Sequence, residues 1–381
     1  MREGWKEQSL ADACQFINGL WKGKVEPFIP VGVIRNTNFT KDGRLDDSDI
    51  AYLDVEAKQY SKRRLKYGDI ILEKSGGGPK QPVGRVVFFD KKEGNFSFSN
   101  FTSAIRVKEP NILDSAYLHK YLFWVYLSGR TESMQSHSTG IRNLNSDAYK
   151  AINIPIPPLP EQRRIVAILD EAFEGIATAK ANAEKNLQNA REVFESHLNA
   201  VFSQRGEGWV EKLFEECIER VACNTKIQRK DYLSEGPYPI VSQEDAFING
   251  FWDKKEDLLA VDSPVVVFGD HTRTLKYIDF DFVLGADGVK VLKPKPFLYP
   301  KFFYYQLQTA KLDSLGYARH YRLLKESSVW YPPITEQRRI VAILDRIHEQ
   351  TFHLESLYQQ KLTALDELKQ SLLHQAFNGD L

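Results

Sequence analysis

The chain has 381 residues, and 51 Lys and Arg are balanced by 51 Asp and Glu, so that its formal net charge is zero. This length indicates two or three domains, and the charge balance excludes a uniformly basic protein, so that any contact with nucleic acid must come from local patches. Its three cysteines, Cys14, Cys217 and Cys223, show no paired framework and no histidine at a ligand spacing, which indicates a reducing compartment and no structural zinc. Since no signal core or membrane span is visible, we expect a cytoplasmic protein.

Residues 1–154 are predicted to form a first globular region of the α+β class. Gly4-Trp5 leads into a short amphipathic piece that ends at Cys14. Strand-like runs separated by Gly, Asn and Asp turns follow it. They cover residues 28–34, 69–72, 85–89 and 96–107. A helix rich in aromatic residues is predicted over residues 113–127.

Residues 155–205 are predicted to form a long helix that begins after a proline-rich turn. The ten residues from Glu161 to Asp170 return unchanged as Glu336 to Asp345, a shift of 175 positions. An internal repeat of this kind has to be interpreted before any other feature, because it sets the architecture. Each copy follows prolines and runs into a helical pattern that ends on a phenylalanine, Phe202 or Phe377.

Apolar residues recur at three- and four-residue steps along both copies, which predicts one apolar stripe on each helix. We expect each stripe to pair with the other copy. The first stripe contains Ile165, Leu169, Ala172, Ile176, Ala179, Ala183, Leu187, Ala190, Phe194 and Leu198. The second contains Ile340, Leu344, Ile347, Leu354, Leu365, Leu368 and Leu372, with Thr351, Tyr358 and Lys361 between them.

Residues 206–331 repeat the plan of the first region, and residues 332–381 form the second helix. Gly208-Trp209 leads to Cys217 much as Gly4-Trp5 leads to Cys14, and an aromatic helix is predicted around residues 299–307. The distance from the opening Trp to the repeated Glu is shorter by 29 residues in the second region. The chain therefore alternates two related domains with two nearly equal helices, an arrangement that a simple dimerisation coil does not require.

Motifs for catalysis are scarce in this sequence. Gly76-Gly77-Gly78-Pro79-Lys80 lacks the spacing of a phosphate-binding loop, and Asp270-His271 has no nucleophile or second acid beside it. Asp69 with Glu73-Lys74 is not a nuclease arrangement, and no glycine-rich cofactor turn is present. We therefore expect a non-catalytic chain without a bound cofactor or metal.

Clusters of basic and amide residues occur in both globular regions, where they would neutralise phosphates and read base edges. Each cluster alone also suits a solvated surface. The candidate DNA-binding residues are Lys62, Arg63, Arg64, Lys80, Arg85, Arg142, Asn143, Lys226, Arg229, Lys230, His271, Arg273, Arg319 and Arg322.

The sequences Pro-Pro-Leu-Pro-Glu-Gln-Arg-Arg-Ile-Val and Pro-Pro-Ile-Thr-Glu-Gln-Arg-Arg-Ile-Val, each after a globular region, resemble the specificity subunit of type I restriction-modification systems. The resemblance covers the whole chain. It implies two target recognition domains, each reading one half of a split, asymmetric target in double-stranded DNA, and two helices paired as an antiparallel coiled coil.

The same resemblance implies partners and a docking site. Two methyltransferase subunits would carry S-adenosylmethionine, and restriction subunits would carry ATP and Mg²⁺. The subunit-docking residues would be those of the repeated motif, Glu161, Gln162, Arg163, Arg164, Glu336, Gln337, Arg338 and Arg339. The residues alone leave an alternative open, a coiled-coil scaffold that presents two protein-binding domains.

Overall fold

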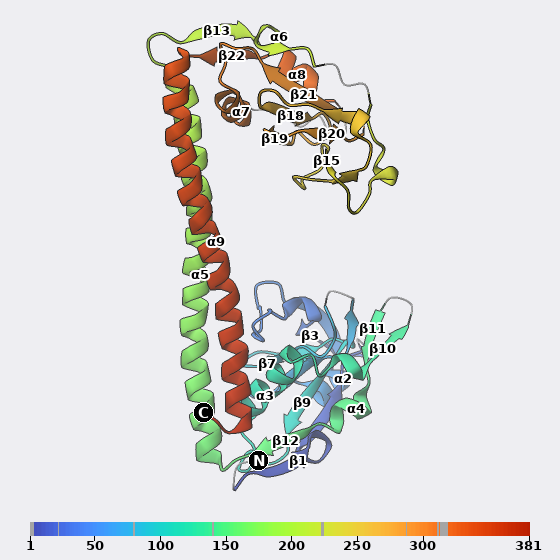
Figure 1. Ribbon diagram of the computed structural model, residues 1–381. Helices are drawn as coiled ribbons and strands as arrows, with labels where there is room; N and C mark the ends of the chain where they lie inside the picture. Colours follow the sequence, from blue (N-terminus) through green and yellow to red (C-terminus); the bar gives the residue numbers. More distant parts are fainter. Residues whose placement is uncertain are drawn as a thin grey trace. The chain divides into compact units, whose positions relative to one another are not determined.

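Figure 1 shows the computed structural model of the chain, which describes residues 4–21, 23–78, 81–138, 141–221, 225–286, 288–310, 312 and 319–381. The chain divides into two compact units. The first is Met1–Ala183 with Gln360–Leu381, and the second is Glu184–Gln359. Each unit therefore contains one globular domain and parts of both long helices. None of the helices in the described ranges is long and apolar enough to cross a membrane.

The two long helices are α5 (Leu159–Ser203) and α9 (Ile334–Asn378), each of 45 residues. Both start directly after a pair of prolines, where the fixed φ of proline suits the turn that precedes a helix. Each carries a glutamate in its first turn, Glu161 or Glu336, where a negative charge interacts favourably with the helix dipole. The sequence thus sets the beginning of both helices by local rules.

Within each unit, α5 and α9 run antiparallel. In the first unit Arg164 of α5 donates to the backbone oxygen of Leu381 at 2.7 Å, and Lys180 forms an ion pair with Asp366 at 2.7 Å. In the second unit Arg191 of α5 pairs with Glu355 at 2.9 Å, and the Phe194 ring lies 4.9 Å from that of His348. A higher residue number on α5 therefore meets a lower number on α9 in both units, and the predicted antiparallel coiled coil is confirmed.

The apolar stripe predicted for α5 faces inward, and most of the stripe predicted for α9 does so too, including Leu365 and Leu372, but the prediction is wrong at Leu354 and Leu368. Leu354 is 39% exposed and Leu368 is 47% exposed. Thr351, which the pattern placed within the stripe, is buried as expected, whereas Lys369 is buried in place of its neighbour Leu368. The Lys369 ammonium lies 5.0 Å from the centre of the Phe123 ring. Aromatic faces attract a cation, so that a lysine fills a seam position where the sequence pattern expected leucine.

The first domain is built around an antiparallel sheet that is buried on both faces. Side chains alternate along each strand: Ile70 and Leu72 join the core under α3 (Ser115–Leu127), whereas Ile71 joins a second core on the opposite face. In spatial order its strands are β2 (Cys14–Asn18), β9 (Thr102–Val107), β5 (Ile70–Glu73) and β7 (Val86–Phe88). The predicted aromatic helix and the strand-like runs over 28–34, 69–72 and 85–89 are confirmed, whereas the run over 96–107 splits into two strands of different sheets, residues 96–98 and 102–107.

Three smaller sheets complete the first domain. One joins β1 (Lys6–Ser9) to β12 (Asn153–Ile156). The second, which covers the second core, contains β4 (Ala51–Glu56), β3 (Phe28–Ile34) and β8 (Phe96–Phe98). The third contains β10 (Gln135–Ser138), β11 (Ile141–Leu144) and β6 (Ser75–Gly77). Short helices are α1 (Leu10–Ala13), α2 (Ala57–Arg63) and α4 (Ser146–Lys150), with 3-10 turns at η1 (Asn36–Asn38) and η2 (Glu132–Met134).

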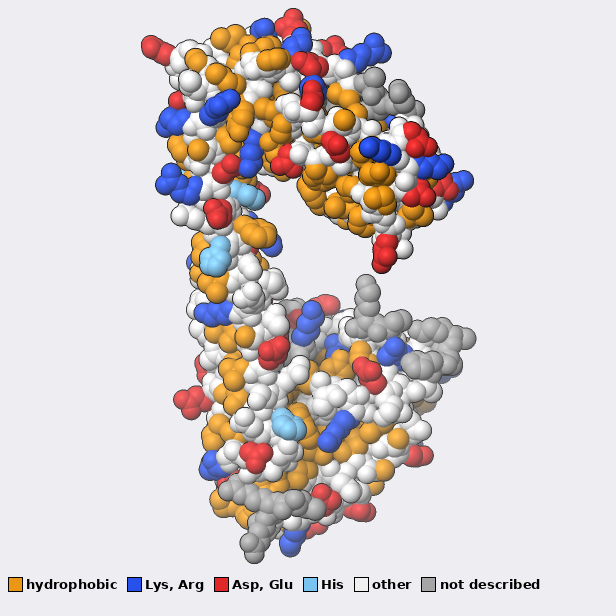
Figure 2. All heavy atoms as spheres, viewed as in Figure 1, with side chains coloured by type: hydrophobic (Ala, Val, Ile, Leu, Met, Phe, Trp, Pro, Cys, Tyr) orange, Lys and Arg blue, Asp and Glu red, His pale blue; other side chains and the backbone are white. Residues whose placement is uncertain are grey.

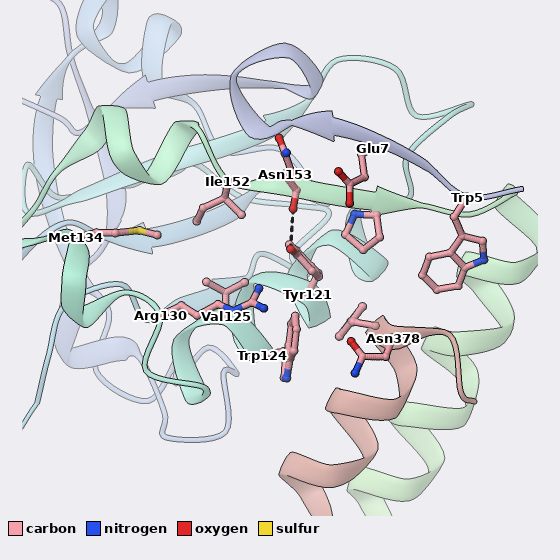
Figure 3. Close-up of a pocket in the computed structure, with 12 residues that line it drawn as sticks. Trp5, Glu7, Tyr121, Trp124, Val125, Arg130, Met134, Ile152, Asn153 and Asn378 are labelled. Atoms are coloured by element: carbon pink, nitrogen blue, oxygen red, sulfur yellow. Dashed lines mark hydrogen bonds between the residues drawn. The ribbon is translucent and has the colours of Figure 1, made fainter. Parts of the chain in front are cut away.

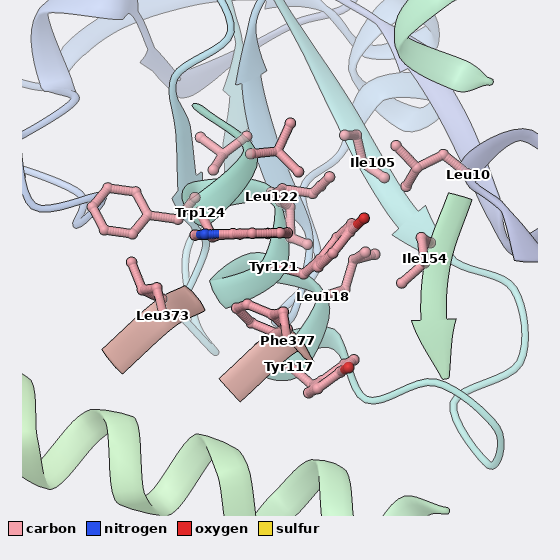
Figure 4. Close-up of a cluster of buried hydrophobic side chains, with 14 of the residues drawn as sticks. Leu10, Ile105, Tyr117, Leu118, Tyr121, Leu122, Trp124, Ile154, Leu373 and Phe377 are labelled. Carbon is pink, nitrogen blue, oxygen red and sulfur yellow. The ribbon is translucent and has the colours of Figure 1, made fainter. Parts of the chain in front are cut away.

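Helix α3 connects this domain to the parts of the long helices in the same unit. Its aromatic residues Tyr117, Tyr121 and Trp124 surround Phe377 near the end of α9, with ring centroids 5.2–5.6 Å apart (Figure 4). Ile165 and Leu169 from the start of α5 join the same buried cluster. The domain is therefore fixed both to the beginning of one long helix and to the end of the other.

The second domain repeats this topology. Its central sheet is β14 (Ile218–Glu219), β21 (Val289–Pro294), β18 (Val265–Gly269) and β19 (Leu275–Ile278), in the order that corresponds to β2-β9-β5-β7. The second layer contains β16 (Gly250–Trp252), β15 (Tyr238–Val241), β20 (Phe282–Leu284) and β17 (Leu258–Leu259). Strands β13 (Val210–Leu213) and β22 (Ser328–Tyr331) pair as β1 and β12 do. The helices are α6 (Phe214–Cys217), α7 (Pro300–Gln308) and α8 (Tyr321–Lys325), with 3-10 turns at η3 (Arg229–Asp231) and η4 (Lys255–Asp257).

Helix α7 takes the place of α3 in the second unit. Phe202 from the end of α5 contacts Phe302 of α7, with ring centroids 5.1 Å apart. Ile340 and Leu344 from the start of α9 join the same buried cluster. The described cysteines Cys14 and Cys217 are free and buried, and burial raises the pKa of the Cys14 thiol to about 12, so that it serves packing rather than chemistry. Cys223 lies outside the described residues.

Candidate nucleic-acid interface

The repeated Glu-Gln-Arg-Arg motif contains a buried glutamine that joins each long helix to its domain. The Gln162 side chain accepts from the backbone nitrogen of Asp114 at 2.8 Å and donates to the backbone oxygens of Ile112 and Pro157. Asp114 is the N-cap of α3. The Gln337 side chain repeats this pattern with the nitrogen of Tyr299, the N-cap of α7, and with two backbone oxygens.

This geometry corrects the docking role expected for the two glutamines. Both side chains are 0% exposed, and each satisfies three backbone groups that would otherwise lack a partner. The sequence pattern indicated correctly that this position matters. Its role is to fix the angle between helix and domain, and it presents no surface to a partner subunit.

The other residues of the motif lie at the surface. Arg164 donates to Glu161 and Arg339 donates to Glu336, with Nε–Oε2 distances of 2.8 Å in both copies. Arg163 and Arg338 are exposed beside these pairs. The two units thus carry the same arrangement of charges at the same helix start. These six residues remain candidates for subunit docking.

Arg85, predicted to bind DNA, is instead part of an internal ion pair. Its guanidinium contacts both carboxylate oxygens of the buried Glu73, at 2.7 and 2.9 Å, and donates to the backbone oxygens of Asn36 and Phe39. Only 13% of its side chain is exposed. Four of its five N–H donors are used inside the domain, so we correct the expectation: Arg85 supports the loops at the end of β5.

The residues that follow β5 meet β11 at the edge of the domain. The Ser75 hydroxyl donates to Oδ1 of Asn143 at 2.5 Å, and the Asn36 side chain donates to the backbone oxygen of Ser75 at 2.7 Å. Arg142 pairs with Gly77 in the strand register, and the ladder is irregular between Arg142 and Asn143. The structure therefore brings Arg142 and Asn143 together with the end of the central strand. Lys80 lies outside the described residues.

The basic residues of α2 lie near the same edge. Lys62 and Arg64 are exposed, whereas the Arg63 side chain donates to the backbone oxygen of Gly19 and to Gln59. Lys74, which precedes Ser75, donates to the side chain of Asn18 at 3.3 Å. Because Asn18 and Gly19 are neighbours, one turn links α2 to the loop after β5.

In the second domain the loop after β18 meets the segment before α8. The backbone nitrogen of His320 donates to the backbone oxygen of Asp270 at 2.9 Å, and the nitrogen of Tyr321 donates to the Asp270 carboxylate at 2.7 Å. The candidates His271 and Arg273 lie on the first segment, and Arg319 and Arg322 lie exposed on or beside the second. The structure thus assembles four predicted residues from two distant parts of the sequence.

Gln243 lies in this assembly and has no signal in the sequence. Its side-chain oxygen accepts from the backbone nitrogen of His271 at 3.2 Å, and its backbone oxygen accepts from the Thr272 hydroxyl at 2.7 Å. A side chain at Gly269 or Gly288 would collide with Gln243. Arg273 has φ +63°, the left-handed region that residues other than glycine rarely adopt, and donates to the backbone oxygen of Leu312. The loop is therefore held in one shape by short-range contacts.

Lys226, Arg229 and Lys230 are exposed on a separate segment of the second domain. Arg229 lies 3.3 Å from the Glu244 carboxylate, which places this segment beside the loop that contains Gln243. The exposed guanidinium keeps most of its surface free for solvent or a ligand. These three residues could therefore add phosphate contacts at the margin of the assembled loops.

The surface charge is mixed on the face shown in Figure 2, where blue Lys and Arg side chains alternate with red Asp and Glu. Acidic residues considered for catalysis have structural roles: Asp69 is buried and accepts two hydrogen bonds from Arg106. Among the described residues, no group of three or more His, Cys, Asp or Glu could hold a metal ion.

Three comparisons with known proteins agree with this architecture. The sequence matches the family described as "Type I restriction modification DNA specificity domain" over residues 2–188 and 206–364. It is 22% identical to the putative type I restriction enzyme MjaX specificity subunit of Methanocaldococcus jannaschii, over all of this chain and 94% of that protein. It is 21% identical to the EcoKI specificity subunit of Escherichia coli, over all of this chain and 89% of that one.

A shorter match, of 31% identity, is to a putative specificity subunit of Haemophilus influenzae and covers 41% of this chain and 40% of that protein. Among solved structures, a chain from a type I R-M system studied for complex assembly and conformational transition has a TM-score of 0.80 at 18% identity, over 100% and 99% of the two chains. The HsdS subunit from Thermoanaerobacter tengcongensis has a TM-score of 0.61 at 17% identity, over 100% and 98%. By its two matched domains and this fold, the chain belongs to the type I restriction modification DNA specificity domain family.

Proposed function

We propose that this chain is the DNA-reading subunit of a type I restriction-modification complex and that each domain reads one half of a split, asymmetric target. One observation carries the proposal. In both domains the residue after the central strand accepts a backbone hydrogen bond from a residue just before a short helix: Leu144, two positions before α4, donates to Lys74, and His320, directly before α8, donates to Asp270. Each of the two domains thus brings two loops together at the end of its central strand.

The side chains on these loops differ between the domains, as two separate half-sites require. Asn143 and Arg142 stand at this place in the first domain, and His271, Arg273 and Arg319 in the second. Arginine and asparagine form bidentate hydrogen bonds with base edges in the major groove, and exposed cations such as Lys62 and Lys226 neutralise phosphates. Because the two domains differ in these side chains, we expect the two halves of the DNA target to differ in sequence.

The chain itself is proposed to be non-catalytic. Partner methyltransferase subunits would supply S-adenosylmethionine and take the target adenine out of the stack, and restriction subunits would supply ATP and Mg²⁺. Exposed apolar residues on α9 support the docking of partners. Phe352 is 66% exposed, Leu354 39% and Leu357 48%, so that several large apolar side chains of this helix are available to a partner.

Mapping methylated adenines across the genome, with and without the gene, tests the proposal. We expect one bipartite, asymmetric motif to lose methylation when the gene is removed. Replacing residues 206–330 with the matching domain of a relative should then change one half of the motif and leave the other half intact. A methylation pattern that is the same with and without the gene would favour the alternative, a scaffold that presents two protein-binding domains.

A further inference from the structure

An open hollow of about 590 Å³ lies within the first unit, where β1 and β12, helix α3 and the end of α9 meet (Figure 3). Its walls include the aromatic rings of Trp5, Tyr121 and Trp124, together with aliphatic and polar side chains. The Tyr121 hydroxyl donates to the backbone oxygen of Asn153 at 2.7 Å, which fixes that ring in the wall. None of the residues that line the hollow is one of the candidate DNA-binding residues.

Two charged side chains also line the hollow. The Arg130 guanidinium already lies over the Trp124 ring, 4.4 Å from its centre. Glu7 is exposed on β1, directly opposite Pro155 of β12 in the strand register. The carboxylate of Glu7 can therefore receive a cation that enters the hollow beside a flat apolar group.

The second unit fills the corresponding place with its own side chains. Glu211 of β13 lies opposite Trp330 of β22, the register that Glu7 and Pro155 have in the first unit. Arg205, just beyond the end of α5, stacks on the Trp330 ring at 4.2 Å from its centre. Its Nε donates to the backbone oxygen of Phe202, the residue that corresponds to Phe377. The Trp330 indole and the Arg205 guanidinium thus occupy the corner between the paired strands β13 and β22 and the end of α5.

We propose that the hollow of the first unit is a docking site for a partner protein segment that presents a tryptophan next to an arginine or lysine. The partner would supply what Trp330 and Arg205 supply in the second unit. The indole would pack among the aromatic walls, and the cation would approach Glu7. That the partner is a methyltransferase subunit rests on the proposed function, whereas the preference for an aromatic and cationic pair does not.

The binding step can be tested on the purified full chain with acetyl-tryptophanyl-arginine amide as the probe, followed by saturation-transfer NMR. We expect saturable binding with a Kd on the order of 1 mM, since a dipeptide makes few contacts. Acetyl-tryptophanyl-glutamate amide should bind about tenfold more weakly, because its charge opposes Glu7. Equal binding of the two dipeptides, or tighter binding of adenosine than of either, would overturn the proposal.

Two substitutions locate the site. Pro155→Trp places in the first unit the side chain that the second unit already has, and it should abolish probe binding; Val25→Trp, an equally apolar change at an exposed position elsewhere, should not. Trp330→Ala should empty the corresponding corner of the second unit, so that each chain binds two dipeptides instead of one. Undiminished binding by the folded Pro155→Trp chain would show that the probe sits elsewhere and would reject the site.

The identity of the partner is tested separately by titrating methyltransferase subunits onto the chain. Pro155→Trp should weaken this association by about tenfold or more, as the loss of an aromatic anchor does at protein interfaces, while Val25→Trp leaves it unchanged. If the dipeptide binds but the methyltransferase affinity does not respond to Pro155→Trp, the docking role fails although the chain still directs methylation. Loss of the methylation motif in the gene-deletion experiment reports on the proposed function independently of both results.

Discussion

The two globular domains share a topology and differ at the end of their central strand. In the first domain β5 ends on Glu73, whose buried carboxylate is held by Arg85. In the second domain β18 ends on Gly269, which leaves room for Gln243 and Thr272. The two domains therefore have the same layers, but different contacts hold the loops at the end of the central strand: a buried ion pair in the first domain and packing around Gln243 in the second.

The first domain is longer than the second because several of its connecting segments are longer. Longer connections separate β3 from β4, β5 from β7, and α3 from α4 in the first domain than separate the corresponding elements in the second. Two of these connections supply β6, β10 and β11. Apart from Ile141 and Leu144, the residues of these three strands are polar or glycine, so that this sheet adds little core and instead presents polar groups.

The largest effect on stability is expected from breaking the ion pair that only the first domain has at this strand end. Arg85→Ala leaves the Glu73 carboxylate buried without its partner and should lower the free energy of unfolding of the first unit by about 3–5 kcal/mol. Chemical denaturation, with Arg273→Ala in the exposed loop of the second domain as control, measures this. A loss of the same size in both variants would mean that burial of the pair is not the cause.

Two further substitutions test the buried glutamine contact that the two domains share. Gln162→Ala and Gln337→Ala each leave three buried backbone groups without partners, and each should cost about 2–4 kcal/mol. Hydrogen exchange should show the loss at the start of α3 in the first variant and at the start of α7 in the second. Arg163→Ala, at the exposed position next to Gln162, is the control and should change stability little.

A third prediction separates the domains by their reading of DNA. Asn143→Ala removes one polar side chain from the loops of the first domain, and a bidentate contact with a base is worth about 1–3 kcal/mol of discrimination. Methylation mapping should therefore show relaxed sequence preference in one half of the motif only. Relaxation in the half assigned to the second domain by the domain replacement would contradict the separation of the readers.

The smallest effects are expected along the coiled coil, where the two units are alike. Lys180→Ala in the first unit and Arg191→Ala in the second each remove one partly exposed ion pair between α5 and α9, worth about 0.2–1 kcal/mol. Raising the salt concentration should reduce both effects, because it screens exposed charges. Thermal unfolding in low and high salt checks this, and an effect that persists in high salt would indicate a packing role for these side chains.

The sequence alone determined the repeated helices and the two related domains, whereas the antiparallel pairing of the helices was an expectation from the family resemblance. These features follow from patterns that are local or exactly repeated: the prolines before each helix, the apolar periodicity of α5, and the alternation of strand residues. Leu368 of the α9 stripe was predicted wrongly, because Lys369 occupies the seam position beside it by pairing with Asp42 at 2.8 Å and covering aromatic rings. The periodicity of one helix cannot predict these partners, because they belong to other segments of the chain.

Only the tertiary structure decided what the individual polar residues do. Arg85 is an internal support because Glu73, Asn36 and Phe39 converge on it from three segments, and Gln162 is buried because α3 begins against the first turn of α5. His271, Arg273 and Arg319 become neighbours because Asp270 binds the backbone before α8. The physical reason is that charge and hydrogen-bonding capacity are properties of a residue, whereas burial and the partners that use this capacity are set by contacts between distant parts of the chain.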